Sequence, residues 1–319
     1  VVQDPIPFYR ALRETAPVWR VPGTDIVTVA TFDALSEAVG RVEDFSSNLE
    51  ALIYRGADGT PERYPFTGAG IQTLATADPP LHTVHRRAVF PELVAKRMMQ
   101  LEPEITRFTE ALLDSVLAHD SFDFMAEVAN LIPINVVSWL VGFRDADPLA
   151  LLQAAFDSTE MLAGTMSLAE LEAMQTRTHE VGFWIAGQLM DSLDAPGDGI
   201  LGAVARAVQS ETIAFESGVV VLHTLLSAGG ESTSSLLGNA VRILAEQPDL
   251  QQRLREHPTL VESFVEEALR LESPFKFHMR SAPRATSLGG TEVPEGATVL
   301  LLWGAANRDA AEYERPDDV

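Results

Sequence analysis

Residues 228–233 read Ala-Gly-Gly-Glu-Ser-Thr and lie within a long apolar run, residues 212–245, that predicts a single helix. Each glycine inside a helix costs about 1 kcal/mol relative to alanine, so the hexapeptide weakens the helix that contains it. Residues four apart share a helix face, which places Thr224, Ala228 and Ser232 on one stripe with Glu231 beside it. Small residues at 228–230 leave room for a flat or bulky group near the backbone.

The hexapeptide has two interpretations. The glycines alone favour tight packing between helices. The acid and two hydroxyls that follow them favour a functional site, in which Glu231 relays protons and Ser232 presents a hydroxyl to a ligand. Ser232 can also bond to the carbonyl one turn back and bend the helix.

Helical periodicity dominates the rest of the chain, above all from residue 80 to about 192 and from 249 to 271. Short strands are predicted at 18–21, 26–29 and 296–303, and Thr31 is predicted to cap a helix that runs to Val39. Residues 46–80 are rich in Gly, Pro and Thr and are predicted as a long loop. The sequence therefore predicts one mainly α domain over residues 1–319, with a small β-sheet formed by both ends of the chain.

Charge and composition exclude several classes of function. The chain has 46 acidic and 23 basic side chains and a formal charge of -23, which argues against nucleic acid or anionic membrane as partners. It contains no cysteine, so disulfides, cysteine nucleophiles and thiolate ligands are excluded within it. No apolar run has the roughly 18 residues of a membrane span, and the start does not resemble a signal peptide. We expect a cytoplasmic protein whose sequence begins inside a longer chain, since it lacks an initiator Met.

The segment DPPLHTVHRR, residues 78–87, predicts the start of a helix on which His82 and Arg86 share a face and can reach one anion. A metal pair of His82 and His85 is disfavoured because no third ligand is apparent.

Two further motifs are weak when taken alone. Glu267 and Arg270 are three apart and can pair on a helix, although exposed pairs contribute only a few tenths of a kcal/mol. Arg280, at the edge of the predicted sheet, is by itself a surface arginine. The sequence contains no nucleophile elbow, phosphate-binding loop or dinucleotide fingerprint.

Taken in order, these motifs resemble those of a soluble bacterial cytochrome P450, and the resemblance covers essentially the whole chain. DPPLHTVHRR resembles the helix that holds a heme propionate, and AGGEST the oxygen-activating segment of the central helix. EEALRL resembles the ExxR helix, and PFKFHMRSA the strand whose arginine binds the other propionate. Residues 293–319 resemble the stretch that leads to the heme-binding loop.

The resemblance implies a heme-dependent monooxygenase with heme b (iron protoporphyrin IX). It would insert one atom of O2 into a lipophilic small molecule, with electrons from a ferredoxin and its reductase. The residues that would contact the cofactor are His82, Arg86, Arg280, Ala228 and Gly229. The proton relay would be Glu231, Ser232 and Thr233, and Glu267 and Arg270 would be structural. Substrate would contact Thr224, Ser227 and Ala228, beneath a roof of residues 50–75 and 161–168.

The chain departs from the family at two points. The family usually has threonine at position 232, and serine lacks the methyl that fixes the rotamer, so we expect a looser relay with Thr233 as a substitute. The family's axial cysteine and the arginine that completes the ExxR triad would fall beyond Val319, so we expect a chain truncated at its C-terminus. Two alternatives stay open: a non-catalytic P450-like binding or scaffold protein without heme, and an unrelated helical ligand-binding protein.

Overall fold

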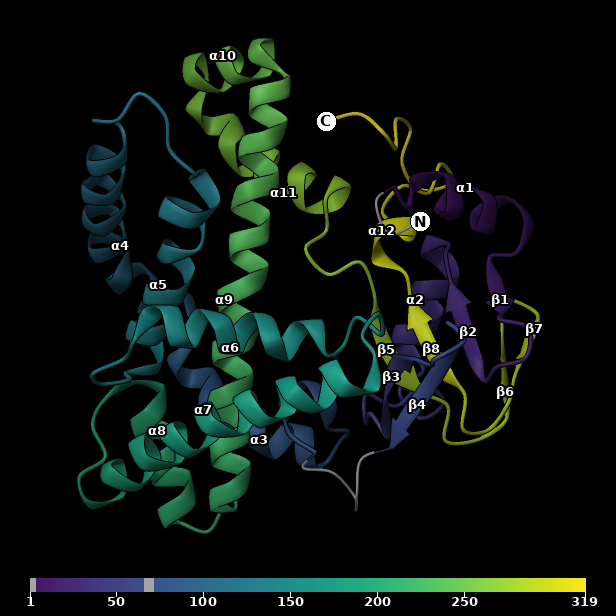
Figure 1. The fold of residues 1–319 in the computed structure, drawn as a ribbon, viewed down its shortest axis with the longest axis horizontal. Helices are drawn as coiled ribbons and strands as arrows, with labels where there is room; N and C mark the ends of the chain where they lie inside the picture. The colour runs from purple at the N-terminus through teal and green to yellow at the C-terminus, as the bar shows by residue number, and fades with distance from the viewer. Residues whose placement is uncertain (1–3, 66–71) are drawn as a thin grey trace. The chain divides into compact units, whose positions relative to one another are not determined.

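The computed structural model describes residues 4–65 and 72–319, which form helices and small sheets joined by turns and loops (Figure 1). Residue contacts group the chain into two compact units, Val1–Leu49 with Leu236–Val319, and Glu50–Ser235. The mainly α fold class is confirmed. The assignment of residues 1–319 to a single domain stays a prediction.

The first unit contains a four-stranded sheet in the order β1 (Val18–Arg20), β2 (Ile26–Val29), β8 (Thr298–Leu301) and β5 (His278–Ser281). β2 pairs with β8 in parallel, so that Val27 lies opposite Val299, and both side chains are fully buried. The other two pairings are antiparallel. The predicted sheet built from both ends of the chain is therefore confirmed.

The rest of the first unit consists of helices and one hairpin, which precede, separate or follow the strands of this sheet along the chain. The helices are α1 (Ile6–Thr15), α2 (Phe32–Gly40), α10 (Pro248–Glu256), the 3₁₀ turn η4 (Pro258–Leu260), α11 (Val261–Leu271) and α12 (Trp303–Ala306). The hairpin joins β6 (Thr286–Leu288) to β7 (Thr291–Val293).

The start of α2 corrects one prediction. Thr31 occupies the N-cap position, but its side chain makes no capping hydrogen bond. The Phe32 N–H instead donates to Asp309 Oδ2 at 3.0 Å, so an acid from the far end of the chain satisfies one of the free N–H groups. A carboxylate at a helix N-terminus is also favoured by the helix dipole.

The second unit begins with a hairpin of β3 (Ala51–Arg55) and β4 (Pro61–Pro65), where the sequence predicted a long loop. The prediction of a loop here is wrong because Ala51–Arg55 buries Leu52 and Ile53 and because Asp58-Gly59 forms a turn, with Gly59 at φ +85°. Of the expected roof, residues 66–71 lie outside the described residues.

The remaining elements of this unit are helical. They are η1 (Leu74–Thr76), α3 (Leu81–Val89), η2 (Phe90–Glu92), α4 (Ala95–Val116), the π-helix η3 (Met125–Ala129), α5 (Leu131–Val141), α6 (Pro148–Glu160), α7 (Leu168–Asp194) and α8 (Gly199–Gln209). Their core contains the fully buried Ile134, Ile185, Leu189 and Ile200.

The long helix predicted from the opening hexapeptide is α9, Phe215–Glu246, drawn in Figure 1 as one continuous rod. Its residues up to Ser235 belong to the second unit and its last residues to the first. No helix of residues 4–65 and 72–319 combines the length and apolarity needed to cross a membrane.

Candidate functional site

Gly229 and Gly230 let α9 approach two neighbouring helices closely. A Cβ atom on Gly229 would lie 2.9 Å from Val137 Cγ2 of α5. On Gly230 it would lie 3.1 Å from Ala155 Cβ of α6 and 3.3 Å from Ile134 Cδ1. Carbon atoms in good contact are about 3.5–4.0 Å apart, so both positions need glycine for packing. The packing interpretation thus accounts for the glycines, and contact of Gly229 with heme stays a prediction.

The predicted polar stripe of α9 runs through Thr224, Ala228 and Ser232. Ala228 is exposed although it lies in the middle of a 32-residue helix. Ser232 Oγ donates to the Ala228 carbonyl at 2.6 Å, and Thr224 Oγ1 donates to the Val220 carbonyl at 2.7 Å. Thr233 is exposed. A small exposed residue flanked by hydroxyls one turn away in each direction is a surface that a flat ligand can approach.

Glu231 lies on the side of α9 that faces α6. Burial raises the pKa of Glu231, the charge of Glu160 raises it further, and a hydrogen bond with the Thr159 side chain lowers it. Its Oε2 atom is buried and has no hydrogen-bond partner among the described residues. A carboxyl group in this setting holds a proton more readily than an exposed glutamate, which suits it to donating a proton.

The α3 helix carries the predicted anion-binding pair. Its turn spacing places His82 and Arg86 on one face; Arg86 is exposed, and its guanidinium lies 4.7 Å from the centre of the Phe90 ring. His85 is only 1% exposed and belongs to the interior. Burial, and next the charge of His82, lower the pKa of His85, so this imidazole is neutral over a wider pH range than a free one.

Arg280 lies in β5, opposite Val299 of β8, and its Nη1 donates to the Met279 carbonyl at 2.8 Å. It is partly buried. Its role in binding heme stays a prediction.

The Glu267–Arg270 pair joins α11 to the last residues of the chain. Arg270 is 8% exposed, and its Nε and Nη2 donate to the two carboxylate oxygens of Glu267 at 3.0 and 2.7 Å. This hydrogen bonding lowers the pKa of Glu267. The guanidinium also donates to carbonyls of the C-terminal segment, at 3.0, 2.7 and 2.8 Å from Asn307, Pro316 and Asp318. The buried guanidinium of Arg270 therefore anchors the irregular segment of residues 307–318 to α11.

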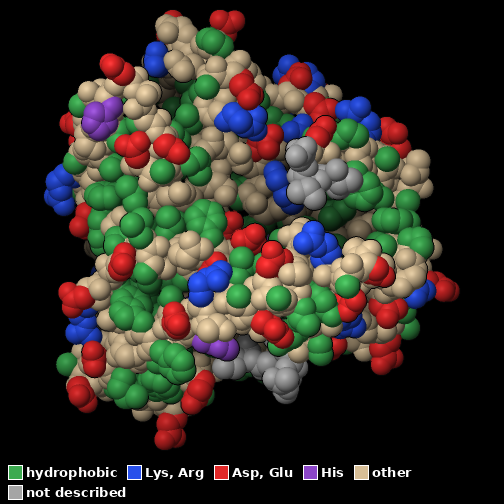
Figure 2. Space-filling model, viewed as in Figure 1, with side chains coloured by type: hydrophobic (Ala, Val, Ile, Leu, Met, Phe, Trp, Pro, Cys, Tyr) green, Lys and Arg blue, Asp and Glu red, His purple; other side chains and the backbone are tan. Residues whose placement is uncertain are grey.

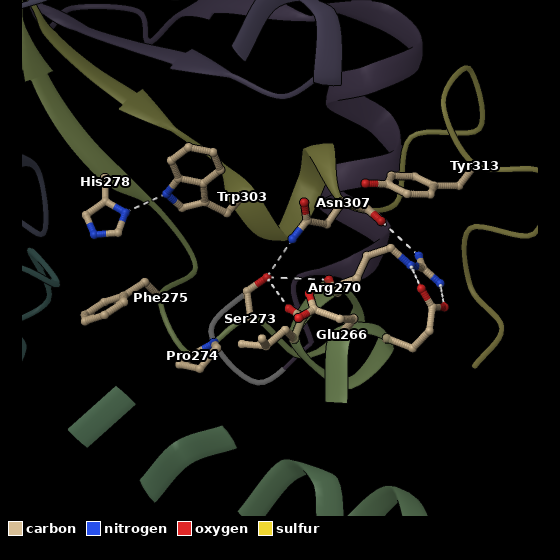
Figure 3. Close-up of a pocket in the computed structure, with 11 residues that line it drawn as sticks. Glu266, Arg270, Ser273, Pro274, Phe275, His278, Trp303, Asn307 and Tyr313 are labelled. Carbon is tan, nitrogen blue, oxygen red and sulfur yellow. Dashed lines mark hydrogen bonds and ion pairs between the residues drawn. The ribbon is translucent and has the colours of Figure 1, made fainter. Parts of the chain in front are cut away.

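A cavity of about 520 Å³ lies beside this pair. Figure 3 shows Arg270 and Tyr313 at one end of it and Phe275 and His278 at the other. Trp303 Nε1 donates to His278 Nδ1 at 2.6 Å, and burial, then the charge of Arg280, lower the pKa of His278. Sequence reasoning missed this aromatic cluster, because a lone His and a lone Trp in different segments give no spacing signal.

Acidic side chains are spread over the face drawn in Figure 2 and do not gather into one patch. This distribution favours the interpretation that the charge of -23 is a dispersed surface charge. Among residues 4–65 and 72–319, no group of three His, Asp or Glu side chains could hold a metal ion.

Comparison with known proteins identifies the class to which this fold and these motifs belong. The family model for Cytochrome P450 matches residues 201–319. The chain is 40% identical over 319 residues to Cytochrome P450 144 of Mycobacterium tuberculosis, covering 99% of this chain and 74% of that protein. The chain therefore belongs to the cytochrome P450 family, whose general function is monooxygenation.

Solved structures agree. The cytochrome P450 CREJ in complex with (4-ethylphenyl) dihydrogen phosphate has a TM-score of 0.87 and 26% identity, over 99% of this chain and 79% of its own. CYP109E1 from Bacillus megaterium in complex with testosterone has a TM-score of 0.84 and 25% identity, over 99% and 80% of the two chains.

The residues present could bind the carboxylates and the flat face of a heme, but none of them could supply the thiolate ligand of its iron. Arg86 is an exposed cation one turn from His82, which suits a carboxylate, and Ala228 presents a small exposed side chain on α9. The sequence contains no cysteine, so none of its side chains can supply the thiolate that the family's iron takes.

Proposed function

We propose that this chain forms most of a cytoplasmic, heme-dependent monooxygenase that inserts one atom of O2 into a lipophilic small molecule. The observation that carries the proposal is a half-buried Glu231 with a raised pKa, directly before Ser232, at the point where α9 exposes Ala228. In a chain 40% identical to a cytochrome P450, this is the arrangement expected of a proton donor beside an oxygen-activating group.

Heme b would supply the oxygen-activating chemistry when bound. His82 and Arg86 would bind one of its carboxylates and Arg280 the other, because arginine and carboxylate form paired hydrogen bonds. The axial cysteine would follow Val319. Ala228 and Gly229 would lie against the flat face of the cofactor.

The relay would use three side chains of α9. Glu231 holds a proton at its carboxyl group, and Ser232 turns its hydroxyl from the Ala228 carbonyl, where it now lies at 2.6 Å, toward the ligand. Thr233 offers a second, exposed hydroxyl. Because serine turns more freely than threonine at χ1, the relay is less firmly oriented than the family's usual one.

A lipophilic substrate fits the apolar lining expected of the roof. Leu52 of β3 packs with Met166 and Leu171, and several partly buried apolar side chains surround them: Tyr54, Tyr64, Met161, Leu162 and Met174. Methionine-rich surfaces adapt to ligands of different shape. The related proteins named above were solved with an ethylphenyl phosphate and with testosterone. Thr224, Ser227 and Ala228 would complete the contacts from α9.

Electrons would come from a ferredoxin and its reductase. In a chain with net charge -23, the exposed side chains of Arg87, Lys96 and Arg97 follow one another closely at the end of α3 and the start of α4. Such a basic stretch would attract an acidic electron carrier. Reduction rates that do not fall as salt rises would contradict this assignment.

The test of the proposed function is a set of α9 variants of the heme-loaded protein. Glu231→Gln should lower kcat about 100-fold, a typical contribution of general acid catalysis, without changing the ferrous–carbon monoxide spectrum. Ser232→Thr should raise the amount of product per NADH consumed. The matched control is Ser234→Ala, which removes a buried hydroxyl of α9 that donates to the Gly230 carbonyl at 2.9 Å. Unchanged turnover in Glu231→Gln would show that Glu231 is not the proton donor of the reaction.

The alternative is a P450-like binding or scaffold protein without heme, which the absence of cysteine favours. Failure of the natural gene product to take up heme would support it.

A further inference from the structure

His278 of β5 makes a hydrogen bond that determines which of its ring nitrogens carries a proton. Trp303 Nε1 donates to His278 Nδ1 at 2.6 Å. An indole nitrogen can only donate, so Nδ1 accepts and carries no proton itself. Figure 3 shows this nitrogen turned toward Trp303 and the second ring nitrogen turned away from it. In the neutral ring the second nitrogen, Nε2, therefore holds the proton and is an N–H donor on the side away from Trp303.

The surroundings of His278 favour this neutral form. Burial, and next the charge of Arg280, lower the pKa of His278 below the ordinary histidine value of about 6.5. Two aromatic rings lie close to the imidazole, with the ring centres of Phe275 and Trp303 at 5.0 and 5.9 Å from its own. Part of the residue is nevertheless exposed, so a ligand can reach it.

Arg280 lies on the same face of β5 as His278, because alternate residues of a strand point to the same side. In the register with β8, His278 lies opposite Leu301 and Arg280 opposite Val299. Alternate residues of a strand are about 6.6 Å apart. Two donors on the two oxygens of one carboxylate are separated by about the same distance. The strand thus places a neutral N–H donor and a guanidinium where they can share one carboxylate.

The chemistry of this pair favours a carboxylate over a metal ion. One charged and one neutral donor suit a group with a single negative charge and two acceptor oxygens. A metal ion would need a ring nitrogen with a free lone pair, whereas Nδ1 of His278 accepts from Trp303 and Nε2 carries the proton. The positive charge of Arg280 beside the ring would also repel a cation.

We propose that His278 is a second donor to the heme carboxylate assigned to Arg280, and that Trp303 is a positioning residue that orients the imidazole for this bond. Nε2 of His278 and the guanidinium of Arg280 would both donate to that carboxylate. The assignment rests on the proposed function, because the carboxylate belongs to the cofactor. The hydrogen bond from Trp303 to His278 does not rest on it, since both residues belong to the protein.

A donor fixed in this way should slow the release of heme. Arginine has a long, flexible side chain, whereas the short side chain of His278 is held by Trp303 and packs beside Phe275. A donor that is already oriented loses less conformational freedom when it binds. We therefore expect His278 to act on the retention of the cofactor, which can be measured without turnover.

The first test is nitrogen NMR of the His278 ring in the natural gene product, in its diamagnetic ferrous–carbon monoxide form. At pH 7 the parent should have its proton on Nε2 and none on Nδ1. Trp303→Phe keeps an aromatic ring but removes the donor, so it should give a mixture of the two neutral forms. The control is Trp184→Phe, which changes an indole packed beside Phe143 in the second unit and should leave His278 unaffected. A proton on Nδ1 in the parent would overturn the proposal.

The second test is the rate at which heme passes from the protein to excess apomyoglobin. His278→Phe should speed this release about 10- to 100-fold, the size expected for one hydrogen bond to a charged group. His278→Gln keeps an N–H donor and should recover much of the retention. With heme dimethyl ester, whose carboxylates are blocked, the parent and His278→Phe should release the cofactor at equal rates.

Equal release of ordinary heme by His278→Phe and the parent, or the same acceleration with the ester, would overturn the role of His278 and leave the proposed function untouched. A parent protein that takes up no heme at all would instead overturn the proposed function, and the role of His278 with it. The carbon monoxide spectrum of the parent distinguishes these two failures.

Discussion

Replacing Gly229 by alanine is the sharpest test of how α9 is packed. In an unconstrained helix this change stabilises by about 1 kcal/mol, because alanine has the higher helix propensity. At position 229 the new Cβ would lie 2.9 Å from Val137 Cγ2, well inside ordinary carbon contact. Overpacking of a buried helix contact costs about 1–3 kcal/mol. The two terms together predict a net loss of about 1 kcal/mol in the free energy of unfolding.

Gly187→Ala is the matched control. Gly187 lies in the interior of α7, and no described atom would lie within 4 Å of its added Cβ beyond its own helix. This variant should gain about 1 kcal/mol, so the two glycine substitutions should differ by about 2 kcal/mol in urea unfolding.

A double variant identifies the contact responsible. Val137→Ala removes the Cγ2 atom that the new Cβ would meet. Combining it with Gly229→Ala should therefore cost less than the sum of the two single changes, by about 1–2 kcal/mol. If Gly229→Ala is as stabilising as Gly187→Ala, or if the double variant is strictly additive, the close approach of α9 and α5 is refuted.

Three further changes have definite outcomes. Asp157→Asn should cost about 1–3 kcal/mol, a range that allows for the 46% exposure of its partner Arg177. The hydrogen bond with Arg177 lowers the pKa of Asp157 in the folded protein. The stability that this ion pair contributes is therefore present above about pH 3.9, the pKa of an unfolded aspartate, and is lost as the pH falls through the pKa of the folded state. The acid unfolding curve of Asp157→Asn should lack this loss. His85→Leu should flatten the fall in stability below about pH 6.5, because an imidazole whose pKa is lowered must charge as the chain unfolds; an unchanged slope would contradict this. Arg270→Lys should cost about 2 kcal/mol and speed hydrogen exchange in residues 307–318, since lysine cannot reach Glu267 and three carbonyls together; equal exchange would refute the anchoring role.

Strong periodicity made the long elements predictable. The apolar run 212–245 became α9 at Phe215–Glu246, and residues 26–29 became β2 with the same bounds. The β3–β4 hairpin was missed because its polar strand, Pro61–Pro65, has no buried alternation to show. The cap of α2 was missed for a different reason: Asp309 lies far from Phe32 in sequence, and no local pattern reports such a pair.

For the candidate site, too, the sequence predicted some features and the structure was needed to find others. The spacing of four that links His223, Ser227 and Glu231 is visible in the sequence, but only the structure shows that all three side chains have an unpaired buried atom. Equally, the sequence left two interpretations of Gly229 and Gly230, and the neighbouring Val137 and Ala155 account for them by packing. Such contacts depend on helix–helix geometry, which periodicity does not encode.

The most direct test of the central claim is the ferrous–carbon monoxide spectrum of the natural gene product, including any residues that follow Val319. A monooxygenase of this family should bind heme and give the red-shifted Soret band of thiolate-ligated iron, and replacing Arg86 and Arg280 by alanine should weaken heme retention. A protein that takes up no heme, or whose spectrum is that of histidine-ligated iron, would contradict the account.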